Sequence, residues 1–322
     1  MSSSKDASIM LSVVMPAYNE SESLPIFFPK LLAEITATVG DSYEIIIVND
    51  GSKDKTLDFL HSIARKNKRI KVLNFSRNFG KEIATTAGIY SAKGQATVII
   101  DADGQHPAEL IPKFFQLWKE GYQVVIGVRQ SNIKEGVVKS WGSRLFYRLF
   151  NATSGTELIP GATDFRLIDS AVQQEFVHFT ERYRITRGLI DWMGFKRISV
   201  PFNANERIGG QASYKVSQLF KLALNSFVSL SMAPLYAIGY VGLFIVSAAF
   251  VGGIFIFIEQ LLLSDPLNLN VTGTAMVSLL ILFMVGVLMT GQGLLAVYMS
   301  HIHIQTQNRP LFIIDKSGSA NL

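Results

Sequence analysis

The sequence predicts an α/β protein whose catalytic part is a mostly parallel sheet covered by helices on both faces. Three observations predict this class. Short β-branched apolar runs alternate with helical patterns, two acidic residues follow one such run, and two long charge-free stretches lie near the C-terminus. Strands that alternate with helical segments favour a parallel sheet, whereas the charge-free stretches indicate a second, more apolar part of the chain.

Five apolar runs are expected to be strands, and they are Leu11–Pro16, Tyr43–Asn49, Ile70–Asn74, Thr97–Asp101 and Gln123–Val128. The segments between them have helical spacing, which predicts helices at Leu24–Thr38, Thr56–Lys66, Gly80–Ser91 and Ala108–Lys119. In sheets of this class, ligands bind beyond the carboxyl ends of the strands. The polar residues expected at that edge are Asn19, Glu20, Asp50, Asp101 and Asp103.

Two stretches of the C-terminal part, Leu222–Ile258 and Pro266–Ser300, contain no charged residue. The whole chain is 48% apolar, with a mean hydropathy of +0.28. A membrane-spanning helix needs roughly 20 apolar residues. We therefore expect spans near Ala233–Ile258 and Thr272–Met299. Buried core helices are the alternative, but both stretches are longer than such helices need.

Basic residues flank the expected spans on one side only. Lys215 and Lys221 precede the first span, Arg309 and Lys316 follow the second, and the connector 259–271 has no Lys or Arg. Positive charge stays on the cytoplasmic side of a membrane. We therefore expect the N-terminal domain and both termini to be cytoplasmic. The polar N-terminus predicts no cleaved signal peptide.

The chain has a formal net charge of +5 and no cysteine. The absence of cysteine excludes a disulfide and a thiolate metal site. A basic chain suits an anionic membrane surface or a nucleic acid, but no nucleic-acid motif appears, so we expect a lipid bilayer and no nucleic acid as partner. Basic and aromatic residues interleave in two segments, about 134–152 and 214–232, as in helices that lie in the headgroup plane.

These patterns divide the chain into four parts. A cytoplasmic domain at 1–213 is followed by a juxtamembrane helix at 214–232, two spans within 233–300 and a cytoplasmic tail at 301–322. The tail contains the apolar run Leu311–Ile314, which is expected to dock as a strand on the domain or on a neighbouring subunit.

Two carboxylates, Asp101 and Asp103, follow a strongly apolar run. Side chains at this spacing point the same way from an extended segment. Adjacent carboxylates repel unless a cation lies between them, and oxygen ligands suit Mg²⁺ or Mn²⁺, which usually share their remaining positions with substrate phosphates. An acidic turn after a buried strand is the alternative, and this pair alone does not decide between them.

Six motifs occur in order along the chain, and they are Val13–Glu20, Asn49–Ser52, Ser76–Glu82, Asp101–Gln105, Gly161–Leu167 with Arg187–Leu189, and Arg207–Tyr214. This set resembles the family 2 glycosyltransferases of the GT-A fold, which is Rossmann-like. Within them it is similar to the polyisoprenyl-phosphate glycosyltransferases, which include dolichol-phosphate mannose synthase and the bactoprenol glucosyltransferases. The resemblance covers about residues 10–230, and the two expected spans match the bactoprenol group.

The resemblance implies roles for the residues at matching positions. Those implied for nucleotide-sugar binding are Pro16, Ala17, Tyr18, Glu20, Asp50, Asp101, Ala102, Asp103, Arg207, Gln211, Ser213 and Lys215. Asp101 and Asp103 are implied as ligands of Mg²⁺ or Mn²⁺ and as catalytic residues. Arg129 and Arg144 are implied to bind the lipid phosphate, because the arginine fork suits phosphate oxygens. Asp164 is implied as a catalytic base or as the group that orients the acceptor.

Several of these residues have simpler interpretations that the sequence leaves open. Tyr18 suits ordinary packing, and Asp50 suits a turn before Gly51. Arg144 suits a side chain that extends to the membrane surface. Asp164 suits an ion pair with Arg166 or a helix cap. Ala212 stands where many relatives carry Ser or Thr, so a hydroxyl contact to phosphate is missing there.

The resemblance implies metal-dependent, inverting transfer of a hexose to a polyprenyl phosphate at the cytoplasmic face of the bacterial inner membrane. We expect UDP-glucose as donor and undecaprenyl phosphate as acceptor, with GDP-mannose, UDP-GlcNAc, UDP-galactose and an aminoarabinose donor open. The family also suggests a homotetramer.

This function has three alternatives. A processive polysaccharide synthase is disfavoured because no Gln-x-x-Arg-Trp motif occurs, and a dehydrogenase because no Gly-x-Gly-x-x-Gly follows the first strand. A non-catalytic membrane scaffold with a degenerate transferase domain stays open, although the retained Asp50, Asp101, Asp103 and Arg207 count against it.

Overall fold

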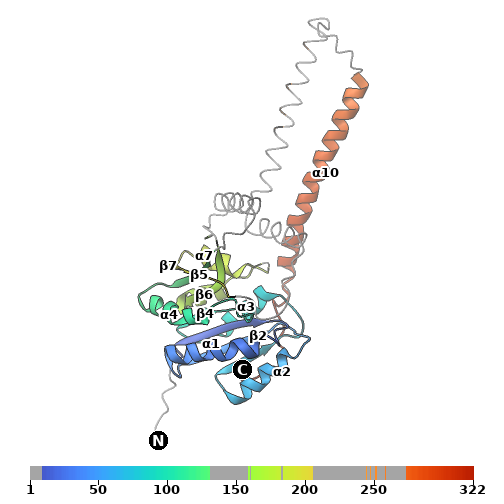
Figure 1. Ribbon diagram of the computed structural model, residues 1–322. Helices are drawn as coiled ribbons and strands as arrows, with labels where there is room; N and C mark the ends of the chain where they lie inside the picture. Colours follow the sequence, from blue (N-terminus) through green and yellow to red (C-terminus); the bar gives the residue numbers. More distant parts are fainter. Residues whose placement is uncertain are drawn as a thin grey trace. The chain divides into compact units, whose positions relative to one another are not determined.

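The computed structural model describes residues 9–130, 159, 161–182, 184–205 and 273–322, with four single positions between 244 and 258. The chain divides into two units (Figure 1). The first comprises Met1–Val216 and Arg309–Leu322, and the second comprises Ser217–Asn308. Each is described by itself.

The first unit is built on a seven-stranded sheet in the order β3-β2-β1-β4-β6-β5-β7. Its strands are β1 (Leu11–Ala17), β2 (Tyr43–Asn49), β3 (Ile70–Asn74), β4 (Ala96–Ile99), β5 (Val124–Arg129), β6 (Ala162–Asp169) and β7 (Arg197–Phe202). Four neighbouring pairs are parallel, and β6 is antiparallel to both β4 and β5. The predicted α/β class with a mostly parallel sheet is confirmed.

Helices cover both faces of this sheet, because its strands alternate buried apolar side chains between the two faces. One core joins the strands to α1 (Leu24–Val39), α2 (Thr56–Lys66) and α4 (Ile111–Lys119), which follows the short 3₁₀ helix η1 (Ala108–Leu110). Two further cores on the other face involve α3 (Lys81–Ser91), α6 (Ser170–Val177) and α7 (Thr186–Trp192). In β1, Val13 belongs to the first core and Val14 to the opposite one.

The strand expected at Thr97–Asp101 ends earlier than predicted. β4 stops at Ile99, and Asp101 and Asp103 lie in the turn that follows. The backbone N–H of Ile100 still donates to β1, but that of Asp101 donates to the Nδ1 atom of His106, 3.3 Å away. The interpretation that both carboxylates project from one face of an extended segment is therefore wrong, because local turn contacts replace the ladder two residues earlier.

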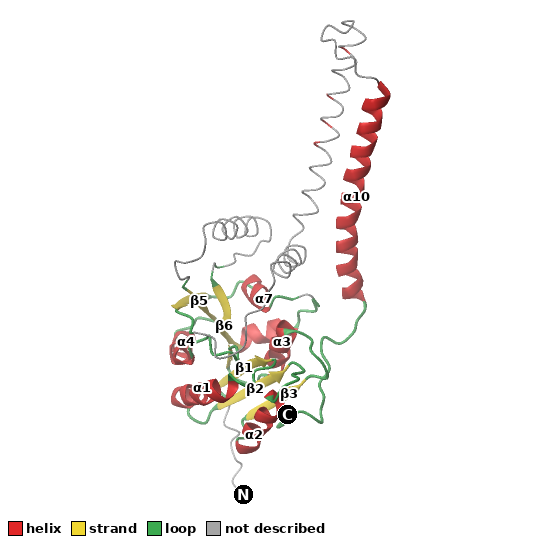
Figure 2. Ribbon diagram, turned by 45° about the vertical axis from the view of Figure 1, so that its right-hand side comes forward, coloured by secondary structure: helices red, strands yellow, loops and turns green. Residues whose placement is uncertain are grey.

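The C-terminal tail, Arg309–Leu322, packs along the edge strand of the first unit. Ile314 forms an antiparallel bridge with Phe75, and Ala320 forms one with Val72. Figure 2 draws the C-terminus beside α2 and β3. The tail therefore occupies hydrogen-bonding groups that an edge strand would otherwise leave unpaired.

The second unit contributes one long described helix, α10 (Gly273–Thr306), at the position of the second expected span. Among the helices in the described part of the chain, none was found to be long and apolar enough to cross a membrane. The prediction of two spans is therefore not confirmed. The first expected span, apart from single positions, and the segments 134–152 and 214–232 lie outside the described residues.

Candidate active site

A cleft of about 380 Å³ lies at the carboxyl edge of the sheet, where β2, β1 and β4 are neighbours. It is lined by residues that follow these three strands and by the start of α3, namely Pro16, Ala17, Tyr18, Glu20, Asp50, Asn78, Gly80, Lys81, Asp101, Ala102 and Asp103. The fold thus brings together eight of the residues implied for nucleotide-sugar binding. A cleft of this size and edge position is usual for small-molecule sites in α/β sheets.

The loop after β1 is fixed by the loop after β2. The backbone N–H of Asn19 donates to Ser52 Oγ at 3.0 Å, and Asn19 Oδ1 accepts from the backbone N–H of Lys53 at 2.9 Å. Glu20 is held in the same way, because its N–H donates to Thr56 Oγ1 at 2.8 Å. Tyr18 directly precedes these two residues and is 42% exposed. Its ring is therefore not a core residue and is available to a ligand.

Asp50 is almost completely buried, at 2% exposure. Its Oδ1 accepts from the backbone N–H of Phe79 at 2.7 Å, and its Oδ2 accepts from that of Gly80 at 3.0 Å. Burial raises the pKa of Asp50, and these backbone hydrogen bonds act in the opposite direction. The carboxylate lines the cleft, and it also holds the loop that leads into α3. A role limited to a turn before Gly51 does not account for these contacts.

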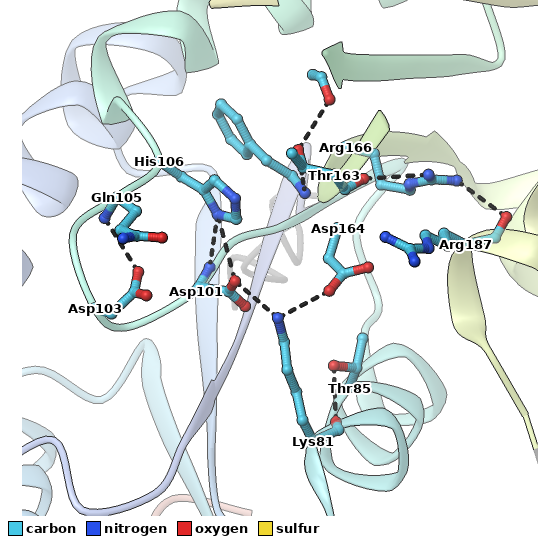
Figure 3. Close-up of polar contacts among 12 residues, drawn as sticks. Lys81, Thr85, Asp101, Asp103, Gln105, His106, Thr163, Asp164, Arg166 and Arg187 are labelled. Carbon is cyan, nitrogen blue, oxygen red and sulfur yellow. Dashed lines mark hydrogen bonds and ion pairs between the residues drawn. The ribbon is translucent and has the colours of Figure 1, made fainter. Parts of the chain in front are cut away.

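The turn that contains Asp101 and Asp103, here called the acidic turn, leaves one carboxylate oxygen without a hydrogen-bond partner among the described residues. Asp103 Oδ1 accepts from the backbone N–H of Gln105 at 3.1 Å (Figure 3). Asp101 Oδ2 accepts from the ammonium of Lys81, whereas Asp101 Oδ1 is buried and has no partner among the described residues. A buried carboxylate oxygen without a partner is costly, and a bound cation would remove that cost.

His106 contacts the backbone of the acidic turn. Its ring stacks on Phe165 with centroids 5.2 Å apart, and its Nδ1 accepts from the backbone N–H of Asp101. Burial lowers the pKa of His106, although Asp101 acts in the opposite direction. The ring is therefore held neutral, with Nδ1 as an acceptor, and it positions the turn.

Lys81, at the start of α3, bridges two carboxylates that come from different parts of the sheet. Its Nζ lies 2.8 Å from Asp101 Oδ2 and 2.8 Å from Asp164 Oδ2 (Figure 3). Burial raises the pKa of Asp164, but the Lys81 ammonium outweighs burial and lowers the pKa to about 2. Burial lowers the pKa of Lys81, and the two carboxylates outweigh it and raise the pKa above its usual value. Lys81 and Asp164 are therefore both charged at neutral pH.

Lys81 is a residue of the site that the sequence alone does not reveal. A lysine at the start of a helix is usually a solvated surface charge. The only sign in the sequence that Lys81 belongs to the site is its place in the Ser76–Glu82 motif. The contact with Asp164 depends on β6, which the sequence did not predict as a strand. The ion bridge is thus a product of the tertiary fold.

The alternative in which Asp164 pairs with Arg166 or caps a helix is wrong. Arg166 is 1% exposed, and its Nη1 lies 3.2 Å from Asp191 Oδ1. Asp164 lies within β6 and contacts Lys81 instead, with the Arg187 guanidinium nearby (Figure 3). Alternate residues of a strand share one face, so Asp164 and Arg166 lie on the same face of β6, yet each has its own partner there, Lys81 for Asp164 and Asp191 for Arg166.

The remaining implied site residues are not brought into the cleft by the described part of the structure. Arg129 ends β5, is exposed and is not among the residues that line the cleft. Arg144, Arg207, Gln211, Ser213 and Lys215 lie outside the described residues. Their roles stay predictions.

The residues present fit a divalent cation. Asp101 offers an unpartnered oxygen, and Asp103 lies in the same turn. Mg²⁺ is commonly bound by one or two protein carboxylates together with substrate phosphates. No group of three or more His, Cys, Asp or Glu residues suited to a metal occurs in the part of the chain that the structure describes. Asp101 and Asp103 would therefore hold such an ion with the help of substrate oxygens.

The fold and this cleft are those of an α/β protein with an acidic turn at the edge of the sheet. The family model for glycosyl transferase family 2 matches residues 12–179. The chain belongs to glycosyl transferase family 2, and the protein is a glycosyltransferase.

Several relatives match nearly the whole chain, among them the following two. An uncharacterized glycosyltransferase of Synechocystis sp. is 37% identical over 306 residues, which cover 95% of each chain. A prophage-derived bactoprenol glucosyl transferase of Shigella flexneri is 34% identical over 311 residues, which cover 97% of this chain and 99% of the relative. Among solved structures, mannosyl-3-phosphoglycerate synthase from Rubrobacter xylanophilus has a TM-score of 0.48 and 14% identity, and the match covers 68% of this chain and 71% of the other.

Proposed function

We propose that this glycosyltransferase transfers a hexose, with glucose as our first choice, from a nucleotide-sugar to a polyprenyl phosphate such as undecaprenyl phosphate. The observation that carries the proposal is the cleft itself. It gathers the loop after β1, the buried Asp50 and the acidic turn in one space of nucleotide-sugar size. The choice of acceptor is supported by the bactoprenol glucosyl transferases among the whole-chain relatives.

The chain's own residues have separable tasks in this reaction. Tyr18 offers an exposed ring to the cleft, and the acidic turn lines the same cleft. The Lys81 ammonium holds Asp101 and Asp164 in fixed orientations through two bonds of 2.8 Å. With its pKa lowered to about 2, Asp164 is a weak base at neutral pH. We therefore assign Asp164 to orientation of the acceptor, whose phosphate oxygen already carries the negative charge that a nucleophile needs.

Asp101 and Asp103 would hold Mg²⁺ or Mn²⁺. When bound there, the ion would neutralise negative charge that develops on a diphosphate leaving group. Arg207, at a position that matches the family's diphosphate-binding arginine, would share that task, and Arg129 and Arg144 would bind the acceptor phosphate. A phosphate oxygen that attacks the anomeric carbon as the nucleoside diphosphate leaves would invert the sugar's configuration.

We also propose that the enzyme works at the cytoplasmic face of the bacterial inner membrane, as a homotetramer. A polyprenyl phosphate is confined to a bilayer, whereas a nucleotide-sugar is water-soluble. The basic residues on one side of the charge-free stretches support this orientation. Fractionation of cells that express the full chain tests the location, and the mass of the purified particle tests the assembly.

Sugar transfer by the purified full-length protein tests the proposed reaction. Undecaprenyl phosphate and Mn²⁺ are supplied with UDP-glucose, GDP-mannose, UDP-GlcNAc, UDP-galactose or an aminoarabinose donor in separate reactions, and the lipid product is identified by mass. We expect one lipid-phosphate hexose with one preferred donor. Failure of every donor in protein that remains folded would contradict the proposal, and a ladder of long sugar chains would favour a polysaccharide synthase instead.

A further inference from the structure

A second cavity of about 750 Å³ adjoins the cleft described above, which is called the donor cleft from here on. Tyr18 and Asn78 line both spaces, whereas Asp101 and Asp103 line only the cleft. The cavity therefore lies next to the cleft on the side of Tyr18. None of the described residues implied for the metal or the acceptor phosphate lines it, and Tyr18 is the one described residue implied for nucleotide-sugar binding that does.

The C-terminal tail forms one wall of this cavity through Ile313, Ile314 and Asp315. The tail is anchored there by its backbone, because the N–H of Ser76 donates to the Ile313 carbonyl at 3.0 Å and the N–H of Asp315 donates to the Asn74 carbonyl at 2.8 Å. This anchoring fixes the position of the wall, and it leaves the Ile313 side chain 53% exposed.

The tail is also connected by packing to the loop that borders the donor cleft. Phe312 stacks on Phe75 with ring centroids 5.2 Å apart, and Phe75 contacts Phe79 edge-on at 5.5 Å. The backbone N–H of Phe79 in turn donates to Asp50. One connected series of contacts therefore links the tail to Asp50, which lines the donor cleft.

The chemistry of the cavity suits a nucleoside. Tyr18 supplies an exposed aromatic face, and Lys53 and Arg77, which line the same cavity, supply cations. Asn49 is 1% exposed, and its Oδ1 has no hydrogen-bond partner among the described residues, so it can accept from a base or a ribose hydroxyl. A nucleoside attached to a diphosphate at the acidic turn would extend toward Tyr18 and this space.

We propose that the C-terminal tail is part of the donor site, and that Ile313–Asp315 closes the cavity that takes the nucleoside of the nucleotide-sugar. This inference rests on the proposed function, because it requires a nucleotide-sugar donor. The six sequence motifs all precede the charge-free stretches, so none of them includes the tail. The inference therefore gives the tail a part in donor binding that the motifs do not imply.

Nucleotide binding by tail variants of the full-length protein tests this inference. Ile313→Trp fills the cavity, and Ile313→Glu adds a charge to it, while both keep the backbone anchors. Ile26→Trp is the matched control, because Ile26 is 51% exposed on α1 and lines neither space. The probes are UDP, GDP and pyrophosphate, each titrated calorimetrically in the presence of Mn²⁺, with circular dichroism to verify folding.

We expect both Ile313 variants to bind the preferred nucleotide at least about tenfold more weakly, a change of about 1.4 kcal/mol. Pyrophosphate binding should change less than about twofold, since it occupies only the acidic turn. The Ile26 control should bind all probes like the wild type. Unchanged nucleotide binding by both folded Ile313 variants overturns the inference and leaves the proposed function standing. A wild-type protein that binds neither UDP nor GDP overturns both.

Discussion

Lys81 and Asp164 are 83 positions apart in the chain, yet Lys81 Nζ and Asp164 Oδ2 lie 2.8 Å apart. The same ammonium contacts Asp101, so one cation joins α3, the acidic turn and β6. Without it, two carboxylates near one cleft would repel each other. Lys81 therefore maintains the arrangement on which the proposed reaction depends.

Replacing Lys81 with methionine should lower kcat of sugar transfer at least about tenfold, because each charge-assisted hydrogen bond contributes roughly 1.5–3 kcal/mol. Lys81→Arg should retain more activity than Lys81→Met, since it keeps the charge. The measurement is the initial rate at saturating donor and acceptor.

Lys113→Met provides the control for this change, because Lys113 is an exposed residue on α4 and does not line the cleft. It should match the wild-type rate. Equal rates for Lys81→Met and Lys113→Met, in proteins with equal unfolding temperatures, would show that the ion bridge has no part in the reaction.

Asp103→Asn should weaken Mn²⁺ binding and reduce transfer by at least about a hundredfold, since a metal that stabilises a leaving group supplies several kcal/mol. Glu109→Gln changes the same charge at an exposed position nearby and should leave both quantities unchanged. Manganese affinity is followed by electron paramagnetic resonance, and transfer by product mass. Chelation with EDTA should abolish wild-type transfer, and added Mn²⁺ should restore it. Full activity of Asp103→Asn would refute the metal site.

Much of the fold was predictable because β1, β2, β3 and β5 are largely buried runs. Their residues point into cores on both faces, so apolar residues dominate them, and Ser12, Glu44 and Lys71 are single polar interruptions near the strand starts. β6 was missed for the opposite reason, since it contains Asp164 and the fully buried Arg166, which break the apolar pattern. An ion pair with Asp191 of α7 compensates the buried charge of Arg166. The sequence does not reveal this pair, because only the fold places α7 beside β6.

The candidate site was predictable to the extent that its residues follow strands. Asp50 comes directly after β2 and Asp101 comes two residues after β4, and the parallel arrangement of these strands with β1 brings them to one edge. The roles were less predictable, because they depend on hydrogen bonds between distant loops. Asp50 binds two backbone N–H groups of the loop before α3, and Asp164 binds Lys81.

The contribution of Asp164 to stability should depend on pH in the acid range. Its pKa is lowered from 3.8 to about 2 in the folded protein. A carboxylate with a lowered folded pKa contributes stability above its unfolded pKa and loses that contribution as the pH falls through its folded pKa. The advantage of the wild type over Asp164→Asn in free energy of unfolding should therefore be about 1–2 kcal/mol near pH 6 and disappear toward about pH 2.

Denaturant unfolding of both proteins at several pH values measures this difference. Asp41→Asn serves as the control, because Asp41 is an exposed residue in a surface ion pair with Arg69. An advantage that stays constant down to about pH 2 would contradict the pairing of Asp164 with Lys81 in solution.

The buried pair of Arg166 and Asp191 should be among the most sensitive positions for stability in this unit. Their side chains are each 1% exposed, and Arg166 Nη1 lies 3.2 Å from Asp191 Oδ1. Asp191→Ala leaves a buried guanidinium without its partner, which typically costs about 3–5 kcal/mol of unfolding free energy. Asp41→Ala removes a surface partner at the same 3.2 Å separation and should cost at most about 1 kcal/mol. Equal midpoints for the two variants in urea unfolding would mean that the Arg166 charge finds another partner, and the assignment of Asp191 as its counter-ion would then be wrong.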